Sequence, residues 1–397
     1  MTAEEFLTAK AVRTTTSQVF DLVSEGEGSF YLHMGQLESC ADKVIEVIRE
    51  NYPDLNIPYH SRWGHFKVGG HDRVKSWLDQ AQISDPMERA RCFYDLVTTS
   101  VLLDAGAGPE WAYLENETNE RYGRSEGLAV ASYYLFQQGG FSSQKDQPFL
   151  ADAKGLQSVT PMTIKEAFQV SERNPLIGVE GRALLMSSLG KAIENNSEYF
   201  IGGRIGGLVD YFDQTYGKSF SADKILYVVL RALSSIWPGR LEMDGMRLGD
   251  VWSHTKLGKG SQGYVAFHKL SQWLSYSLIE PLEWAGFKIT DLDELTGLAE
   301  YRNGGLFLDS GVIELRHLGD LAKQHPPQSD LIIEWRALTV QLLDRIAPII
   351  REKLSLEDFP LAKVLEGGTW WTGRKLASEK RSDSSPPLNI KSDGTVF

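Results

Sequence analysis

The amino-acid sequence predicts a mainly α-helical protein with few short strands. Most apolar residues recur at spacings of three and four, which places them on one face of a helix. Alternating β-branched runs are rare, and neither a repeat period nor a βαβ alternation is present. Glycine is frequent, at 37 residues, and its clusters indicate loops between helices. We therefore expect a helical body with glycine-rich connections.

Six segments carry the helical spacing. Asp85 is a suitable N-cap for a helix over residues 87–103, because a proline follows it. Pro238 would end the helix whose apolar face covers residues 225–236. The other helices are expected over residues 162–168, 181–193, 267–279 and 331–349. Outside these helices, a short extended pair is expected within residues 57–68.

We expect residues 1–377 to form a single large helical domain. Within it, an N-terminal lobe would cover residues 1–160, and a lobe that carries the chemistry would cover residues 161–377. Residues 378–397 are polar and contain two consecutive prolines, which is typical of a tail. Apolar residues at position 390 and at the last two positions would attach this tail to the body, so we expect it to wrap the domain.

The composition indicates an ordinary globular protein. A formal net charge of −12 disfavours nucleic-acid binding, because phosphate groups require a basic face. No apolar run approaches the roughly 20 residues that span a bilayer, and the acidic N-terminus lacks the features of a signal peptide. We expect a cytoplasmic protein without membrane contact. Whether it forms a homodimer stays open.

No sequence pattern requires a metal or another cofactor. Cys40 and Cys92 lack the spacing of a zinc site or a disulfide framework, so two reduced thiols are expected. Residues 202–207 resemble a phosphate-binding loop in composition only, because no strand precedes them and no Lys-Ser/Thr pair follows. A loop between helices explains them better, and a contact between Arg204 and an anion is the alternative.

Two stretches in the first third of the chain offer candidate pocket walls. Arg62, Trp63 and His65 combine a guanidinium that can hold an anion with an aromatic and an imidazole group. A packed aromatic loop would explain them equally well. Asp104 and Trp111 follow a helix end, where helix termination already explains the glycines between them.

Asp244 and Asp250 place two carboxylates close together in the sequence. Paired carboxylates suit acid–base chemistry or a metal. A turn explains Asp244, because Asp-Gly is a favoured turn sequence. The role of Asp250 stays open at this point.

Residues 295–312 are the most informative stretch. Glu300, Tyr301, Arg302 and Asn303 bring an acid, a phenol, a guanidinium and an amide into consecutive positions before two glycines. Consecutive helical residues point about 100° apart, so at least one of these side chains faces the interior. The alternative is surface pairing of Glu300 with Arg302, which would contribute little stability.

These stretches resemble the uracil-catabolism protein family of the non-reductive uracil pathway, a former domain of unknown function. The resemblance extends over nearly the whole chain and rests on residues 102–111, 300–307, 367–370 and 392–395. It implies a protein of pyrimidine degradation, and it adds Trp370 to the expected substrate contacts.

The second half of the chain also resembles the queuosine 5′-phosphate N-glycosylase family. A Phe-Tyr-Lys segment of that family is similar to Phe267-His268-Lys269, and its Ala-Asp-Tyr-Arg segment is similar to Ala299-Glu300-Tyr301-Arg302. The two segments have nearly the same separation in both sequences. That family has an all-helical fold similar to DNA glycosylases; its Lys holds the 5′-phosphate and its Asp acts at the anomeric carbon. The resemblance implies that Lys269 binds phosphate and that Glu300 is the catalytic carboxylate, although Glu stands where the family has Asp.

These resemblances imply an N-glycoside hydrolase that needs no cofactor. It would act on a ribosylated, ring-opened uracil intermediate similar to ribosylurea 5′-phosphate and release urea and ribose 5-phosphate. A carboxylate stabilises the oxocarbenium-like sugar in such reactions, and Asp250, Tyr301 or Arg302 would assist the leaving nitrogen. The alternative is a non-catalytic binding or scaffold partner of the uracil-catabolic enzymes. We expect this ribosyl phosphate to contact Lys269, Tyr301, Arg302, Asn303, Asp244, Arg62, Trp63, His65, Asp104, Trp111 and Trp370.

Overall fold

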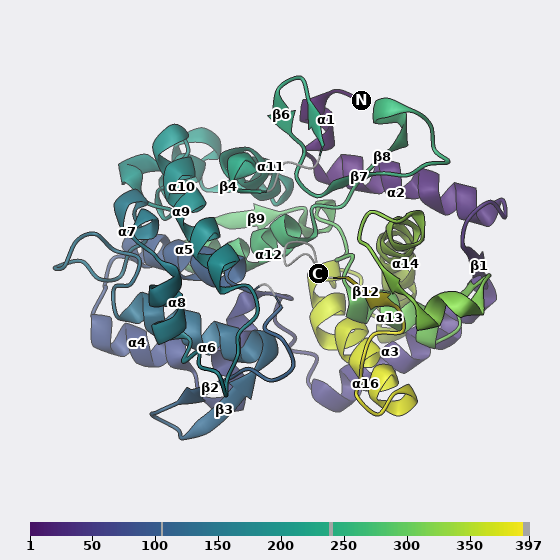
Figure 1. Ribbon diagram of the computed structural model, residues 1–397, viewed down its shortest axis with the longest axis horizontal. Coiled ribbons are helices and arrows are strands. Elements are labelled where there is room, and N and C mark those ends of the chain that lie inside the picture. Colours follow the sequence, from purple (N-terminus) through teal and green to yellow (C-terminus); the bar gives the residue numbers. More distant parts are fainter. Residues whose placement is uncertain (105, 238–240, 392–397) are drawn as a thin grey trace. The chain divides into compact units, whose positions relative to one another are not determined.

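The structure, a computed structural model, describes residues 1–104, 106–237 and 241–391 (Figure 1). Within these residues, sixteen α-helices and only short strands are present, which confirms the mainly helical prediction. Residue contacts divide the chain into two compact units. Unit 1 comprises Met1–His60, Gly239–Trp273 and Asp291–Phe397; unit 2 comprises Ser61–Pro238 and Leu274–Thr290. The expected lobe boundary near residue 160 therefore lies inside unit 2.

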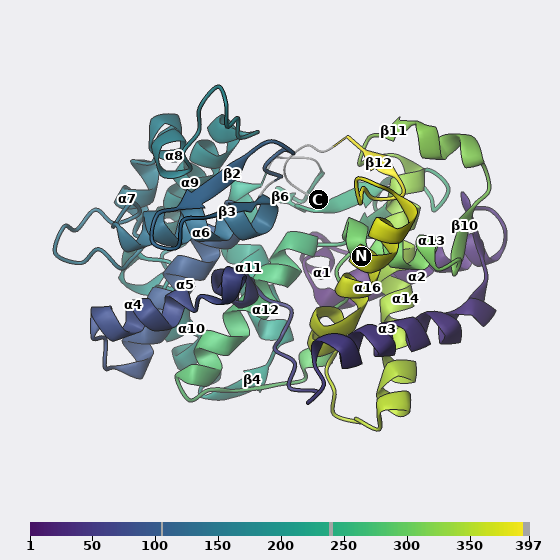
Figure 2. The same cartoon turned by 90° about the horizontal axis from the view of Figure 1, so that it is seen from below.

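Unit 1 is built around one long helix, α14. Its helices are α1 (Ala3–Phe6), α2 (Ala9–Ser24), α3 (Leu37–Asn51), α13 (Tyr301–Asp309), α14 (Asp330–Leu354), α15 (Leu361–Val364) and α16 (Trp370–Lys380). Helix α14 packs against α2, α3 and α13, and α13 packs against α16, as Figures 1 and 2 show. Leu338, Leu342 and Ile346 of α14 are fully buried, which confirms the helical spacing predicted for residues 331–349.

Unit 2 is also helical. Its helices are α4 (Arg73–Ala81), α5 (Pro86–Leu102), α6 (Arg124–Gln137), α7 (Ala153–Gln157), α8 (Pro161–Ala167), α9 (Val179–Asn195), α10 (Gly207–Tyr216) and α11 (Asp223–Ala232). Helix α5 packs against α6, α9 and α10. Asp85 accepts hydrogen bonds from the N–H groups of Met87 and Glu88, which confirms its predicted capping role. Pro238, the expected stop after α11, lies outside the described residues.

Helix α12 (Lys269–Trp284) confirms the helix predicted over residues 267–279 and contributes residues to both units. None of the described helices combines the length and apolar character needed to cross a membrane.

The strands are short and pair two by two. The pairs are β1 (Phe30–Leu32) with β10 (Ile313–Leu315), β2 (Ala112–Glu115) with β3 (Glu120–Gly123), β4 (Ser219–Ser221) with β9 (Lys288–Thr290), β5 (Glu242–Met243) with β6 (Met246–Arg247), β7 (Val251–Ser253) with β8 (Tyr264–Ala266), and β11 (Gln324–His325) with β12 (Asn389–Ile390). The β4–β9 and β11–β12 pairs are parallel, and the others are antiparallel.

The extended pair expected within residues 57–68 was a wrong prediction. Arg62–Gly70 form the 3-10 segment η2 instead. Trp63 and Phe66, three residues apart, are both buried. Side chains three apart lie on the same side of a 3-10 turn, whereas they would point to opposite faces of a strand.

The C-terminal segment is attached to unit 1 as far as residue 391. Arg381 donates to both carboxylate oxygens of Asp309, at 2.9 and 2.5 Å, and Arg302 Nη1 donates to the carbonyl oxygen of Ser384 at 2.9 Å. Ile390 extends this attachment through the pairing of β12 with β11. The last two residues, expected as apolar anchors, lie outside the described residues.

Gly373 marks a close approach of α16 to α13. A Cβ atom at this position would lie 2.2 Å from the carbonyl oxygen of Arg302. We expect Gly373→Ala to lower the free energy of unfolding by about 1–3 kcal/mol, because the helices must separate. Gly181→Ala in α9 is the matched control: no atom lies within 4 Å of its added Cβ, and alanine is the better helix former. Equal urea midpoints for the two variants would contradict this expectation.

Candidate functional site

The predicted site residues occur in both units. Unit 1 contains Glu300, Asp250, Lys269, Tyr301, Arg302, Asn303, Asp244 and Trp370, and unit 2 contains Arg62, Trp63, His65, Asp104 and Trp111. The candidate catalytic carboxylate, Glu300, thus lies in unit 1 together with seven of the other predicted residues.

Glu300 is the N-cap of α13. Its backbone is extended (φ −113°, ψ 165°), and its two carboxylate oxygens accept hydrogen bonds from the N–H groups of Arg302, at 2.6 Å, and Asn303, at 2.5 Å. The residue is 7% exposed. Short polar side chains usually fill this position, and here the longer Glu reaches the same donors. Because the carboxylate binds the backbone and is buried, surface pairing with the Arg302 side chain does not describe it.

Burial raises the pKa of the Glu300 carboxyl above its ordinary value. The two backbone N–H groups act to lower this pKa, and so do the charges of Lys269 and His60. Each carboxylate oxygen keeps a lone pair beyond the hydrogen bond that it accepts. A buried, oriented carboxylate of this kind is suited to stabilise a positive charge that develops beside it.

Asp250 is the partner of a buried guanidinium. Arg336, whose side chain is 1% exposed, donates from Nη1 to Oδ1 at 2.8 Å and from Nη2 to Oδ2 at 2.7 Å. Trp252 Nε1 and the Lys269 N–H donate to the same carboxylate, at 2.6 and 3.0 Å. Burial alone would raise the pKa of Asp250, but Arg336 and these donors hold it well below its usual range. Asp250, one of the three candidates to assist the leaving nitrogen, thus has no proton to give.

The Asp250–Arg336 pair connects the starts of two helices. Asp250 accepts the N–H of Lys269, the first residue of α12, while Arg336 Nε donates to the carbonyl oxygen of Ala299 at 3.5 Å. Ala299 directly precedes Glu300. These contacts hold Lys269 and Glu300 in one frame, which we call the Glu300 site.

Two buried amides support the segment that leads to Glu300. Gln272 Oε1 accepts the N–H of Thr296 at 3.3 Å, and Asn303 Nδ2 donates to the carbonyl oxygen of Leu298 at 3.4 Å. In the described part of the chain, Gln272 Nε2 and Asn303 Oδ1 have no hydrogen-bond partner. An unpaired buried polar atom costs about 1–3 kcal/mol. A donor and an acceptor left in this way indicate that a ligand or an ordered water completes the site.

His60 and Glu366 form an ionisable pair that sequence reasoning missed. His60 Nδ1 lies 2.7 Å from Glu366 Oε2, and 306 residues separate the two, so no local motif marks them. Glu366 belongs to the π-helical turn η8 (Leu365–Thr369), a type of turn that is frequent at functional sites. The ring of His60 lies 6.3 Å from that of Trp370, between centroids. The pair therefore adjoins Trp370, a predicted contact residue.

Asp244 and Arg302, two further predicted residues of unit 1, have structural explanations. Asp244 and Gly245 form the exposed two-residue turn between β5 and β6, with φ values of 52° and 78°. Positive φ at both central residues is what a type I′ hairpin turn requires. The turn alternative thus explains Asp244. Arg302 lies over the ring of Tyr301, with Cζ 4.9 Å from the centroid, and binds Ser384. Arg302 therefore anchors the C-terminal segment.

In unit 2, Arg62 and Trp63 are built into the core. Arg62 is completely buried, and it donates to Asp104 Oδ2 at 2.9 Å and to Ser100 Oγ at 2.8 Å. Burial lowers the pKa of Arg62, against the effect of Asp104. Trp63 Nε1 donates to the carbonyl oxygen of Ser277 at 2.8 Å. Because Asp104 already neutralises Arg62, this pair provides no spare charge for a substrate anion, contrary to expectation.

Trp111 and His65 give no further support for a pocket wall in unit 2. Trp111 is 2% exposed, and its Nε1 donates to the carbonyl oxygen of Phe168 at 2.9 Å. This position explains Trp111 as core. His65 is half-buried within η2.

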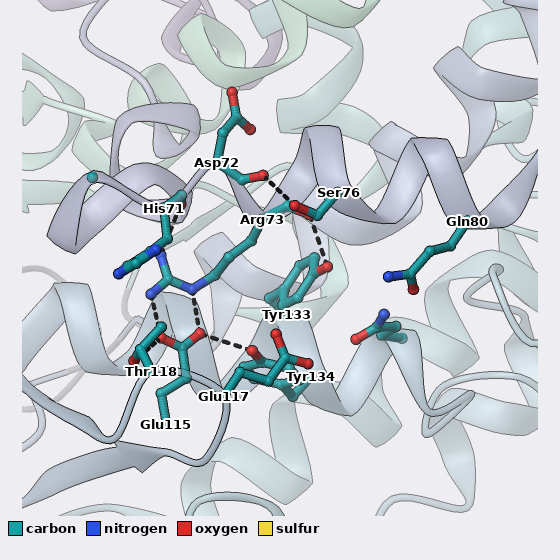
Figure 3. A pocket seen from close by; sticks show the side chains of 12 residues that line it. His71, Asp72, Arg73, Ser76, Gln80, Glu115, Glu117, Thr118, Tyr133 and Tyr134 are labelled. Carbon is teal, nitrogen blue, oxygen red and sulfur yellow. Dashed lines mark hydrogen bonds and ion pairs between the residues drawn. The ribbon is translucent and has the colours of Figure 1, made fainter.

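Unit 2 also contains a polar cavity of about 280 Å³ (Figure 3). The guanidinium of Arg73 and the carboxylate of Glu115 face each other there, with two N–H···O contacts of 2.6 Å each. Tyr134 and Thr118 also donate to Glu115, at 2.8 and 2.7 Å. These charges are satisfied within the protein, so we regard the cluster as a structural element.

No group of three or more His, Cys, Asp or Glu side chains in the described ranges is arranged to hold a metal. Cys40 and Cys92 are free and buried. Burial raises the pKa of the two thiols to about 11 and about 12, respectively.

Comparison with known proteins assigns the chain to a family. A family model described as "Protein of unknown function (DUF1688)" matches residues 5–397. The chain belongs to this family. It is 40% identical to Uracil catabolism protein 4 of Lachancea kluyveri, over 99% of this chain and 98% of that protein. It is 39% identical to Protein urg3 of Schizosaccharomyces pombe, over 100% of this chain and 99% of that protein. These full-length similarities confirm the resemblance to the uracil-catabolism protein family.

Proposed function

We propose that the protein acts in uracil catabolism as an N-glycoside hydrolase. Its substrate would be a ribosylated, ring-opened uracil intermediate of the ribosylurea 5′-phosphate type, and its products urea and ribose 5-phosphate. The name of the Lachancea kluyveri relative supports the pathway. The observation that carries the reaction type is the buried Glu300 carboxylate with the charge of Lys269 close to it.

The two groups match the two ends of a ribosyl phosphate. When the C1′–N bond breaks, positive charge develops on the sugar, and a fixed carboxylate such as Glu300 stabilises it. Lys269 supplies a point charge for the 5′-phosphate. The Asp250–Arg336 pair keeps the two helix starts at a fixed separation. We therefore assign Glu300 to the anomeric carbon, Lys269 to the phosphate and Asp250 to positioning.

Turnover by the purified protein tests this proposal. With synthetic ribosylurea 5′-phosphate, we expect urea and ribose 5-phosphate in equal amounts, followed by NMR and by a urease-coupled assay. Ribosylurea without the phosphate is the matched control, and its kcat/KM should be lower by about 10- to 100-fold because the charged contact to Lys269 is lost. Binding without turnover would refute the hydrolase and favour the non-catalytic binding partner.

A further inference from the structure

Cleavage of a sugar–nitrogen bond requires an acid in addition to the carboxylate. A ureido nitrogen is a poor leaving group unless it gains a proton as the bond breaks. Asp250 cannot provide this proton, because its carboxylate is ionised and paired with Arg336. Arg302 cannot provide it either, because a guanidinium is not deprotonated in proteins. Of the three groups expected from the sequence these two are excluded, which leaves Tyr301 or a group that the sequence did not indicate.

We propose that His60, held by Glu366, is the acid that protonates the leaving nitrogen. This assignment rests on the proposed function. The bond from Nδ1 to Glu366 fixes the orientation of the ring, and Nε2 has no hydrogen-bond partner among the described residues. The side chains of His60 and Glu366 are 10% and 19% exposed. A carboxylate at Nδ1 orients the ring and leaves Nε2 as the nitrogen that exchanges a proton.

The fold connects His60 to the Glu300 site through consecutive contacts. The backbone N–H of His60 donates to the carbonyl oxygen of Ala362 in α15 at 3.0 Å. Its ring adjoins Trp370, the first residue of α16. Helix α16 packs on α13 where Gly373 meets the carbonyl oxygen of Arg302, two residues after Glu300. The charge of His60 also acts to lower the pKa of the Glu300 carboxyl, in agreement with these contacts.

The proposed step balances in atoms and protons. The C1′–N bond breaks, its electron pair stays on the nitrogen, and that nitrogen takes the Nε2 proton of the His60 imidazolium. Glu300 stabilises the positive charge that develops on the sugar. Water then adds to C1′ and passes its proton to Nε2, which restores the imidazolium. One ribosylurea 5′-phosphate and one water thus give one urea and one ribose 5-phosphate.

A comparison of leaving groups tests this assignment. The second substrate is a 4-nitrophenyl ribofuranoside 5-phosphate, because nitrophenolate departs without a proton. We expect His60→Asn to lower kcat/KM for ribosylurea 5′-phosphate by about 10²- to 10⁴-fold, the range of a general acid, and to leave turnover of the nitrophenyl compound close to that of the wild type. Glu366→Gln should show a smaller loss of the same selective kind, because Glu366 is a positioning residue.

Each outcome decides between the two proposals. Equal losses on both substrates, or no loss on ribosylurea 5′-phosphate, would overturn the role of His60 and leave that of Glu300 intact. If His60→Asn does not fold, the same comparison is made with Glu366→Gln, and equal losses there would again refute the acid. Turnover of neither substrate by the wild-type protein would refute the proposed function and the assignment of His60 with it.

Discussion

Glu300→Gln is expected to abolish urea release from ribosylurea 5′-phosphate in a protein that stays folded. The substitution keeps a side-chain oxygen that can accept an N–H of α13, but it removes the negative charge. Stabilisation of developing charge in a buried site is usually the largest contribution to catalysis, so kcat/KM should fall on the order of 10³-fold or more. Urea release measures the loss of activity, and thermal unfolding shows whether the variant stays folded.

Two further variants separate the charge of Glu300 from its capping role. Glu300→Asp keeps the charge and has the side chain of the similar N-glycosylase family, so it should retain part of the activity. Glu300→Ala removes both functions and should cost about 1 kcal/mol of stability through the lost cap. The assignment fails if Glu300→Gln turns over the substrate within about tenfold of the wild-type rate.

The raised pKa of Glu300 gives the same assignment a pH signature. The ionised carboxylate is the active form, so activity is present above the pKa of the folded protein and is lost as the pH falls through it. Because burial raises this pKa, the loss should occur at a higher pH than the value of about 4.3 of an exposed glutamate. Residual activity of Glu300→Gln should lack this decline.

Local patterns predicted the helices well because the information for them is local. The spacing of Leu338, Leu342 and Ile346 describes one face of α14, and the Asp85 cap lies beside the helix that it begins. The segment over residues 57–68 was predicted wrongly, because its buried side chains follow a 3-10 spacing over too few residues to reveal it.

The candidate site depends on contacts between distant residues, which explains what the sequence missed. Lys269 and Glu300 were named through a family resemblance that preserves their separation. Asp250 is a candidate acid by sequence alone, because its partner Arg336 is 86 residues away and no local pattern reveals the pair. The Glu366 carboxylate that holds His60 is more distant still. Pairing across such distances decides whether a carboxylate gives a proton, accepts hydrogen bonds or supports a neighbour.

The Asp250–Arg336 pair is expected to be the electrostatic support of the Glu300 site. Asp250→Asn should lower the free energy of unfolding by about 3–5 kcal/mol, because it leaves the buried Arg336 guanidinium without its carboxylate. Urea unfolding at pH 7 measures the change. Asp244→Asn is the matched control, since this exposed turn residue should change stability by less than about 0.5 kcal/mol. Similar losses for both variants would contradict the role assigned to the pair.

Acid titration of the same variants tests the ionisation that underlies this support. The pKa of Asp250 is lower in the folded protein than the value of about 3.9 in an unfolded chain. Its stabilisation is therefore complete above about pH 4 and is lost as the pH falls towards the folded value. The stability difference between wild type and Asp250→Asn should remain constant from pH 7 to pH 5 and then shrink. A difference that does not change below pH 4 would show that packing, rather than the ion pair, holds Lys269 and Glu300 in place.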